Sequence, residues 1–371
     1  MSKRATGARH GRGAFAAGLA FFFLLAVVLP ATSADAAASV PSAAFKASDL
    51  TGLSLEELYN LDIVQLNVLG GHTHPAGQTM FGYQYMHMNM GEILQGTKQL
   101  SPADVFAQGF GAAHLEMQMD MHMFEVMHAP TERLNLMAML PYKEMSMRHQ
   151  MATGERFTQN AGGIGDLEVM GLYTFFGDIR KGGHRLVLNA GLSFPTGSID
   201  VKDHAMGNPT RPVVQLEYPM QLGSGTYDLL PGLTYLGDSG RWSWGAQTIE
   251  TFRLGRNDAG YTFGDQYRLS GWTAYGITEW FAPSLRLDGV SRDNVTGADA
   301  RLAANTTPEG RPNLQGGQRL DLLFGLNFYV PKGLLKGNRL MLEGGFPVYQ
   351  RLDGPQLGVS WMFSLGWNYA F

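Results

Sequence analysis

The chain has 371 residues, of which 48 are glycine, none is cysteine and 16% are charged. The absence of cysteine excludes a disulfide framework, so hydrogen bonds and burial must stabilise the fold. Without residues 1–36, 24 basic and 31 acidic side chains remain, and the resulting net charge of -7 excludes a protein that binds nucleic acid through a basic surface.

The first 36 residues have the three parts of a secretory signal. A basic start is followed by an uninterrupted apolar stretch over residues 15–29 and by a small-residue cleavage site, Thr32-Ser33-Ala34 or Ala34-Asp35-Ala36. A membrane anchor is the alternative, but a spanning helix needs roughly 20 apolar residues. We therefore predict a cleaved signal peptide at residues 1–36.

Residues 37–77 are predicted to form a periplasmic leader. Leu55 and Leu58 have helical spacing, with Ser54 as an N-cap and Glu57 three residues later, so a short capped helix is expected. The stretch 53–64 also resembles the segment before the plug of TonB-dependent receptors. Since residues 37–77 are too few for a plug domain, we expect a leader without energy-coupled transport.

The last fifteen residues show the clearest alternation in the chain. Odd positions from Leu357 to Phe371 are apolar or aromatic, whereas even positions are small or polar. A period of two predicts a strand with lipid on one face and water on the other. The aromatic Phe371 resembles the carboxy-terminal signature of bacterial outer-membrane β-barrels, which implies the outer membrane as the location.

Similar alternation predicts an all-β fold, an antiparallel transmembrane β-barrel of about twelve strands over residues 78–371. The strands are expected at 80–90, 113–127, 132–145, 163–176, 184–195, 226–236, 241–254, 267–278, 280–292, 318–330, 338–350 and 357–371. Residues 213–221 could be a further strand, but counting them would place the remaining long connections on the wrong side. We therefore expect them inside an extracellular loop, and the long loops are 91–112, 146–162, 196–225, 255–266 and 293–317.

Methionines are concentrated in the first three predicted strands. In strand 113–127 the apolar parity carries Met117, Met119, Met121 and Met123, which predicts that they face lipid while His114, Glu116, Gln118, Asp120 and His122 face the lumen. In strand 80–90 the aromatic residues take the lipid face, which leaves Met86, Met88 and Met90 inward. In strand 132–145 and its extension, Met137, Met139, Met145, Met147, His149 and Met151 share the inward parity.

A cluster of soft ligands is therefore predicted near the extracellular mouth. Thioethers and imidazoles suit copper(I) and related metals. The predicted metal-binding residues are Met86, Met88, Met90, His114, Met145, Met147 and His149. The alternative is that methionine fills lumen space or lines a path for an apolar solute. The segments His72-Thr73-His74 and His204-Ala205-Met206 add little to the metal interpretation, because isolated histidines in polar loops are expected to be solvated.

The polar parity of the strands also carries charges of both signs. We expect neighbouring strands to join them in ion-pair ladders without single-sign ion selectivity. These lumen candidates are Asp166, Glu168, Arg185, Asp228, Arg268, Arg286, Asp288, Arg319, Asp321 and Glu343.

Four turn motifs resemble those of a known family. They are Gly162–Leu167, Gly191–Gly197, Gly223–Asp228 and Gly276–Glu279. They are similar to the outer-membrane family named after the meta-pathway of phenol degradation. Members of that family are usually described as transporters of aromatic or other hydrophobic compounds. The resemblance implies a barrel layout and this broad class of solute.

Together these observations predict a monomeric outer-membrane channel for a small solute, either a hydrophobic or aromatic compound or a soft metal such as copper. The alternative is a barrel that does not transport but binds metal or stiffens the envelope. Nucleotide-binding fingerprints and a convincing serine and histidine arrangement are missing, so we expect no catalytic residues and no enzyme. No cofactor is required, and membrane lipid and the solute are the expected partners.

Overall fold

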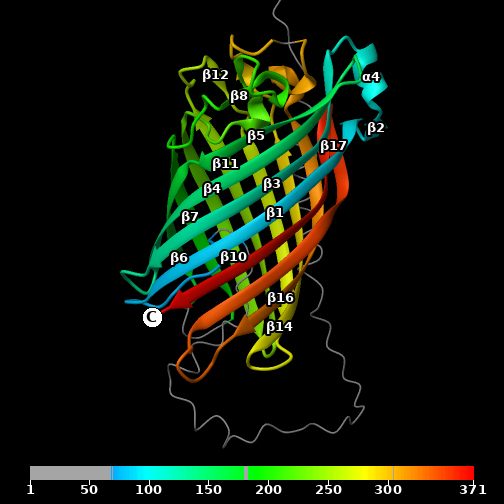
Figure 1. Ribbon diagram of the computed structural model, residues 1–371. Coiled ribbons are helices and arrows are strands. Elements are labelled where there is room, and N and C mark those ends of the chain that lie inside the picture. The colour runs from blue at the N-terminus through cyan, green and yellow to red at the C-terminus, as the bar shows by residue number, and fades with distance from the viewer. Residues whose placement is uncertain (1–67, 69, 179–182, 304) are drawn as a thin grey trace, which may run out of the picture. The chain divides into compact units, whose positions relative to one another are not determined.

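The main sheet of the molecule closes on itself. The computed structural model describes residues 68, 70–178, 183–303 and 305–371. β1 (Thr79–Gly96) pairs with β3 (Ala112–His128) on one side and with β17 (Asn338–Ala370) on the other, which completes the ring in Figure 1. Both pairings are antiparallel, as are the others around the ring. A closed sheet leaves no edge with unpaired backbone groups, which is what a strand structure in a bilayer requires.

Eight further strands complete the ring. From β3 to β17 they are β4 (Leu134–Met151), β6 (Leu167–Phe176), β7 (Arg185–Phe194), β10 (Tyr227–Ser239), β11 (Trp242–Leu254), β13 (Gln266–Tyr275), β14 (Phe281–Arg292) and β16 (Gly317–Tyr329). Two strands pair at its margin: β2 (Lys98–Leu100) with β1, and β5 (Arg156–Ile164) with the last part of β4.

The remaining elements are short and lie in the long connections. They are α4 (Pro102–Ala107), β8 (Lys202–His204), η1 (Ala205–Gly207), β9 (Val213–Gln215), η2 (Tyr218–Met220), β12 (Tyr261–Thr262), β15 (Thr296–Gly297), η3 (Pro308–Gly310) and η4 (Pro312–Leu314). Within the described residues, no helix is both long enough and apolar enough to cross a bilayer. We call the end that carries these long connections the mouth and the opposite end the turn end.

β17 spans the height of the barrel twice. Residues 339–352 pair with β16, whereas residues 352–370 pair with β1. Because β1 and β16 run in opposite directions around the ring, the two arms of β17 must be antiparallel to each other. The side-chain amide of Gln350 joins them by binding the backbone of Val359. The eleven labelled strands of the ring therefore make twelve crossings, as the sequence predicted.

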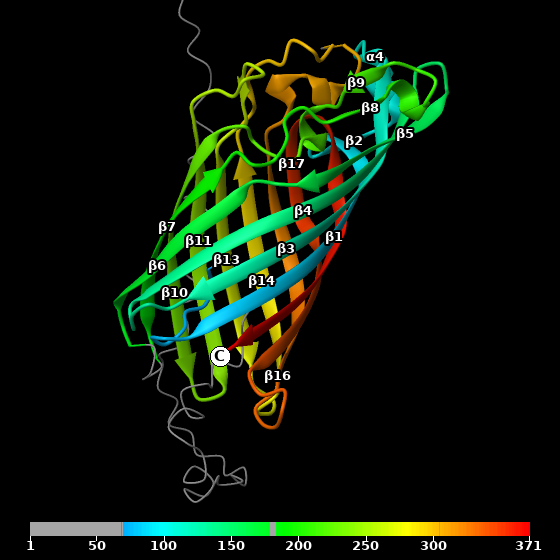
Figure 2. The same ribbon diagram turned by 60° about the vertical axis from the view of Figure 1, so that its left-hand side comes forward.

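The predicted strands are confirmed with small shifts of their ends. β1 and β4 continue beyond the predicted 80–90 and 132–145, to Gly96 and Met151. The ambiguous segment 213–221 is not part of the wall, because β9 pairs only with β8 in a separate two-stranded sheet. Figure 2 shows β8 and β9 at the mouth, together with β5 and α4.

The alternation of the last strand is confirmed for most of its length. Trp361 is 47% exposed and Trp367 42%, whereas Met362 is 8% and Asn368 5% exposed. Towards the mouth the prediction was wrong, because a register shift against β1 lies between Trp361 and Val359. An extra residue in one strand changes which face the following side chains take. Val359 is consequently buried inside the barrel rather than exposed to lipid.

The predicted orientation of strand β3 was wrong. Met121 and Met123 line the lumen cavity and Met117 is buried, whereas Phe124 is 53% exposed on the outer face. The polar positions between the methionines, including Asp120, therefore face outwards. The reason is register: directly opposed residues share a face of the sheet, and β1 pairs its inward methionines with those of β3.

His114 nevertheless faces inward, because β3 has a bulge. His114 pairs with His149 of β4, but the next registered pair is Glu116 with Arg148, so Leu115 is an extra residue. The bulge changes the parity of the strand. His114 and Met117 are consequently both buried although they lie on opposite parities of the sequence.

Candidate functional site

A cavity of about 510 Å³ occupies the lumen. This volume falls within the range of small-molecule sites in proteins. The lining differs between two sides. Methionines come mainly from β1, β3 and β4, whereas the arginines come from β11, β13, β14 and β16, where carboxylates of these and neighbouring strands pair with them. We call these two sides the methionine wall and the charged wall.

The methionine wall is organised in rows that run across the strands. Met362 of β17, Met88 of β1, Met119 of β3 and Met145 of β4 are successive cross-strand partners. Directly opposed side chains in antiparallel strands have Cβ atoms about 4.5–5.5 Å apart, so each methionine can contact the next. A flexible, polarizable thioether side chain can adapt to irregular apolar shapes. The rows therefore offer a continuous soft apolar surface.

A second row lies nearer the turn end. Its members are Met80, Met127, Met137 and Met170, all fully buried in one apolar cluster that also contains Leu172, Val187, Leu230 and Ile249. None of these four methionines lines the cavity, so the row lies beyond it.

The charged wall is tied together by ion pairs, as predicted. Arg286 donates two hydrogen bonds to Glu343, at 3.0 and 2.5 Å. Arg319 donates to Asp321 at 2.9 Å, and Arg268 lies 3.5 Å from Asp288. Further pairing joins Arg253 to Asp228. Because most charges meet a partner of opposite sign, this wall offers fixed polar groups rather than a net field of one sign.

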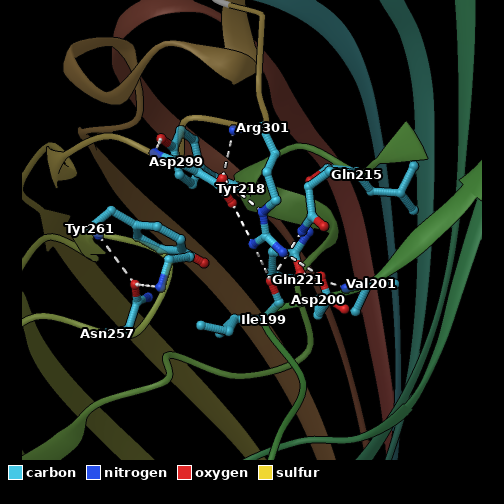
Figure 3. A network of polar contacts seen from close by, with 12 residues as sticks. Ile199, Asp200, Val201, Gln215, Tyr218, Gln221, Asn257, Tyr261, Asp299 and Arg301 are labelled. Carbon is cyan, nitrogen blue, oxygen red and sulfur yellow. Dashed lines mark hydrogen bonds and ion pairs between the residues drawn. The ribbon is translucent and has the colours of Figure 1, made fainter.

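Loop 196–225 contributes Tyr218, Pro219, Gln221 and Leu222 to the lining of the cavity at the mouth. Tyr218 of η2 is buried and lines the cavity. Its hydroxyl oxygen accepts a hydrogen bond from the backbone N–H of Asp299, at 3.0 Å, as Figure 3 shows. Arg301 joins the two loops by binding both Asp299 and Asp200. Although burial opposes it, hydrogen bonds from Arg301 lower the pKa of Asp299 below its ordinary value, so that carboxylate is charged.

The turn end is narrowed by the leader, which the sequence placed in the periplasm. Most of the leader and the whole signal lie outside the described residues, but Val68 and His72 line the cavity. The backbone of His74 makes two hydrogen bonds with Asn135 of β4, at 2.7 and 3.3 Å. His72 and His74 are buried, so the expectation that they are solvated was wrong.

The predicted metal-binding residues separate into three places. Met86 and Met88 line the cavity. Met90, Met145 and Met147 pack with Leu216, Met220 and Leu222 of the loop above them. His114 and His149 lie together, with ring centroids 4.6 Å apart, at the mouth ends of β3 and β4.

Two residues that the sequence did not single out complete the histidine pair. Glu217 precedes η2, and Glu309 lies within η3. His114 Nδ1 is 2.5 Å from Glu309 Oε2, and His114 Nε2 is 3.8 Å from Glu217 Oε1. His149 Nε2 is 4.0 Å from Glu217 Oε2. These acids come from loops far along the chain, so no local spacing could have revealed them.

No protein-family model and no curated protein matches the sequence. Among solved structures, an outer membrane channel from Pseudomonas putida F1 has a TM-score of 0.57 at 12% identity, covering 83% of this chain and 100% of that chain. The transport unit of the autotransporter AIDA-I from Escherichia coli has a TM-score of 0.44 at 9% identity, covering 85% and 96%. The CymD monoaromatic hydrocarbon channel has a TM-score of 0.37 at 9% identity, covering 80% and 89%.

At this identity the first likeness shows the fold alone. The chain is an antiparallel β-barrel of the bacterial outer-membrane type, and its location is the outer membrane.

Proposed function

We propose that this protein is a passive outer-membrane channel for small apolar solutes, aromatic compounds in particular. The observation that carries the proposal is the methionine wall facing a cavity of about 510 Å³. A water-filled pore for polar solutes does not need cross-strand rows of thioethers. An apolar solute gains contacts along such a wall without a specific hydrogen-bonding site.

Movement through the channel is diffusion along the methionine wall. The charged wall keeps the barrel open opposite it, because its ion pairs join side chains of β10 and β11, of β13 and β14, and of β14 and β17. Loop 196–225 narrows the mouth and sets selectivity together with loops 91–112 and 293–317. Opening requires movement of the loop around Tyr218, which lies directly over the cavity.

One likeness supports the solute class and another supports a channel. The turn motifs resemble the family named after the meta-pathway of phenol degradation, whose members are described as transporters of hydrophobic compounds. A solved barrel with the same fold is an outer membrane channel. Membership of the phenol family and the identity of the solute are part of the proposal, as is the monomeric state.

The test is permeation of liposomes that contain the purified protein. Benzyl alcohol serves as the aromatic probe and arabinose as a polar probe of similar size. We expect the protein to raise the entry rate of the aromatic probe, over its rate in protein-free liposomes, more than that of arabinose. Met88→Gln combined with Met121→Gln should reduce this increase about tenfold, since a loss of about 1.4 kcal/mol corresponds to a factor of ten.

The matched control is Met151→Gln, which changes the last residue of β4, a methionine that is absent from the cavity lining. It should leave permeation unchanged. If both variants retain full permeation, the methionine wall is not the solute path. If neither probe enters, the alternative of a barrel that does not transport replaces the proposal.

A second candidate is carriage of a soft metal such as copper(I). The favouring observation is that Met90, Met117 and Met147 form another cross-strand row beside the one through Met88. Thioether sulfur prefers copper(I). The test is copper(I) titration of the purified barrel with Met86, Met88, Met145 and Met147 replaced by Leu. An unchanged affinity would remove this candidate.

A further inference from the structure

We infer that His114, His149 and Glu217 form a binding site for one borderline divalent cation of the Zn²⁺ type, and that this cation clamps the mouth loops to the barrel wall. The three residues offer ligand atoms that all lie within 4.8 Å of one another. The site differs from the thioether rows in its ligands, which are nitrogen and oxygen. Its binding step is independent of the proposed function, whereas its effect on opening rests on that function.

The ligand groups of this site are buried. The side chains of His114 and His149 are each 1% exposed. Nε2 of His114, both ring nitrogens of His149 and Oε2 of Glu217 are buried without a hydrogen bond of acceptable geometry. Leaving such buried groups without a partner is unfavourable. A bound cation would satisfy several of them at once.

A bound cation accounts for more of these groups than a simple ion pair does. A protonated His114 between Glu309 and Glu217 would account for the close contact at 2.5 Å and the longer one at 3.8 Å. It would leave both nitrogens of His149 without a hydrogen bond. The ring of His149 is held in place because it stacks on Phe157, with centroids 4.6 Å apart and planes at 2°. A cation is shared by both rings and needs no proton on either metal-facing nitrogen.

The spacing of the ligand atoms is close to that of a tetrahedral site. In a tetrahedral Zn²⁺ site the metal lies about 2.0–2.2 Å from nitrogen and oxygen, so ligand atoms are about 3.3–3.6 Å apart. Nε2 of His114 lies 3.8 Å from Oε1 of Glu217, and Nε2 of His149 lies 4.0 Å from Oε2. A contraction of a few tenths of an ångström brings each nitrogen to the required spacing from its carboxylate oxygen, and all ligand atoms of the set lie within 4.8 Å of one another. A water molecule would complete four-fold coordination.

Glu309 is a positioning residue in this arrangement. Its Oε2 lies 2.5 Å from Nδ1 of His114, the nitrogen that does not face Glu217. A carboxylate in this place holds the proton on Nδ1 and leaves Nε2 as the metal ligand, as is usual for histidine ligands. Thr307 donates a hydrogen bond to Glu217 Oε1 at 2.8 Å and orients that carboxylate.

The consequence concerns the mouth. His114 and His149 belong to the rigid wall, whereas Glu217 belongs to loop 196–225 and Glu309 to the connection between β14 and β16. Glu217 directly precedes Tyr218, which lies over the cavity. Binding of the cation therefore holds the narrowed form of the mouth, and its removal releases the loop.

The binding test uses the full-length barrel in detergent, stripped with EDTA and titrated calorimetrically with Zn²⁺. We expect one Zn²⁺ per chain. His149→Ala and Glu217→Gln should each weaken binding at least about tenfold, and Glu309→Gln about 10- to 100-fold through His114. The control is His184→Ala. His184 directly precedes β7 at the turn end, and its ring stacks on Tyr235. It should bind as the wild type does.

Resistance to unfolding by dodecyl sulfate in the cold shows which variants retain the folded barrel. Glu217 lies in a loop, so Glu217→Gln still tests the site if His149→Ala does not fold. Absence of stoichiometric Zn²⁺ binding, or equal affinity in Glu217→Gln and His184→Ala, would overturn the inference. Co²⁺ should give the visible absorption of a tetrahedral site in the wild type and lose it in Glu217→Gln.

Conductance in planar bilayers separates the site from the proposed function. We expect Zn²⁺ to lower conductance and EDTA to raise it, with neither effect in Glu217→Gln. If Zn²⁺ binds but no conductance is measured, the inferred metal site stands and the proposed channel function does not. If Zn²⁺ binds and the barrel conducts, but Zn²⁺ does not change the conductance, the proposed clamp is overturned.

Discussion

The charged wall and the methionine wall fill the interior of the barrel with side chains of different character. Both must fill the interior of a closed sheet whose outer face meets lipid. The charged wall uses paired groups such as Arg286 and Glu343, which fit only one geometry. The methionine wall uses rows such as Met88 with Met119, whose side chains have several rotatable bonds. The comparison indicates that rigidity and adaptability can be assigned to different sectors of one barrel.

The difference follows from the energetics of each group. A buried charge that loses its partner is strongly unfavourable, so the charged wall tolerates little rearrangement. Apolar side chains of similar volume replace one another at a small cost. We therefore expect substitutions to divide sharply between the walls.

The largest effect is expected when the charged wall is broken. Arg286→Ala leaves Glu343 buried without its main partner and should lower the free energy of unfolding by about 3–5 kcal/mol. Met119→Leu, on the opposite wall, should cost less than about 1.5 kcal/mol. Guanidinium titration of the barrel in lipid vesicles measures both. Similar losses for the two variants would contradict the division into a rigid and an adaptable wall.

A smaller effect is expected from pH at the segment that enters between the walls. Burial, with His74 and Arg339 nearby, lowers the pKa of His72 well below 6.5. Its neutral ring is retained in the lumen above pH 6.5. Below that pH a released His72 gains a proton, so insertion weakens as pH falls, by about 1.4 kcal/mol for each unit.

Conductance should accordingly rise as the pH is lowered from about 7.5 to about 5.5, a range in which an ordinary histidine titrates. His72→Gln is the matched variant and should show a much flatter response. A wild-type conductance that does not change over this range would exclude release of the segment by protonation of His72.

A still smaller effect is expected from one charge that lines the cavity. Arg268 is less buried than Arg286 and lies 3.5 Å from Asp288. Arg268→Gln removes a cation from the charged wall, and we expect the preference for K⁺ over Cl⁻ to rise about two- to fivefold, which corresponds to roughly 0.5–1 kcal/mol near a partly screened charge. Reversal potentials in a salt gradient measure it. An unchanged reversal potential would mean that ions do not pass beside this wall.

The smallest effect is expected outside both walls. Arg148 and Glu116 form an ion pair at 2.7 Å on the outer face of β4 and β3, with Arg148 more than half exposed. Arg148→Ala should change the free energy of unfolding by about 0–1 kcal/mol, since exposed pairs contribute little. The same guanidinium titration measures it. A loss as large as that of Arg286→Ala would show that location in the lumen does not explain the stability of the charged pairs.

The sequence predicted the parts of the fold that depend on local alternation. The outward face from Trp361 to Phe371 and the exclusion of Val213–Gln215 from the wall both followed from a period of two and from the alternation of long and short connections. The ion pairs of the lumen also followed, because opposite charges were assigned to the inward parity of neighbouring strands.

The other features of the fold and of the site depend on the register between strands, which cannot be derived from a single sequence. Met121 was assigned to lipid because methionine is apolar, but its partner in the register is Met86, an inward residue. Register shifts at Leu115 and before Trp361 changed the parity within single strands. Glu217 reaches His149 only because a long loop folds back over the mouth, and Val68 reaches the lumen only because the leader enters it.

The extra residue at Leu115 has a consequence for how this protein can vary. It makes the orientation of the first residues of β3 depend on a residue count rather than on residue identity. Deletion of Leu115 would place His114 next to Glu116 in regular alternation, so the imidazole would stay opposite His149 and inside the barrel. An in-frame deletion of this one residue should therefore be better tolerated than deletion of another residue of β3, which would reverse the face taken by the side chains on one side of it.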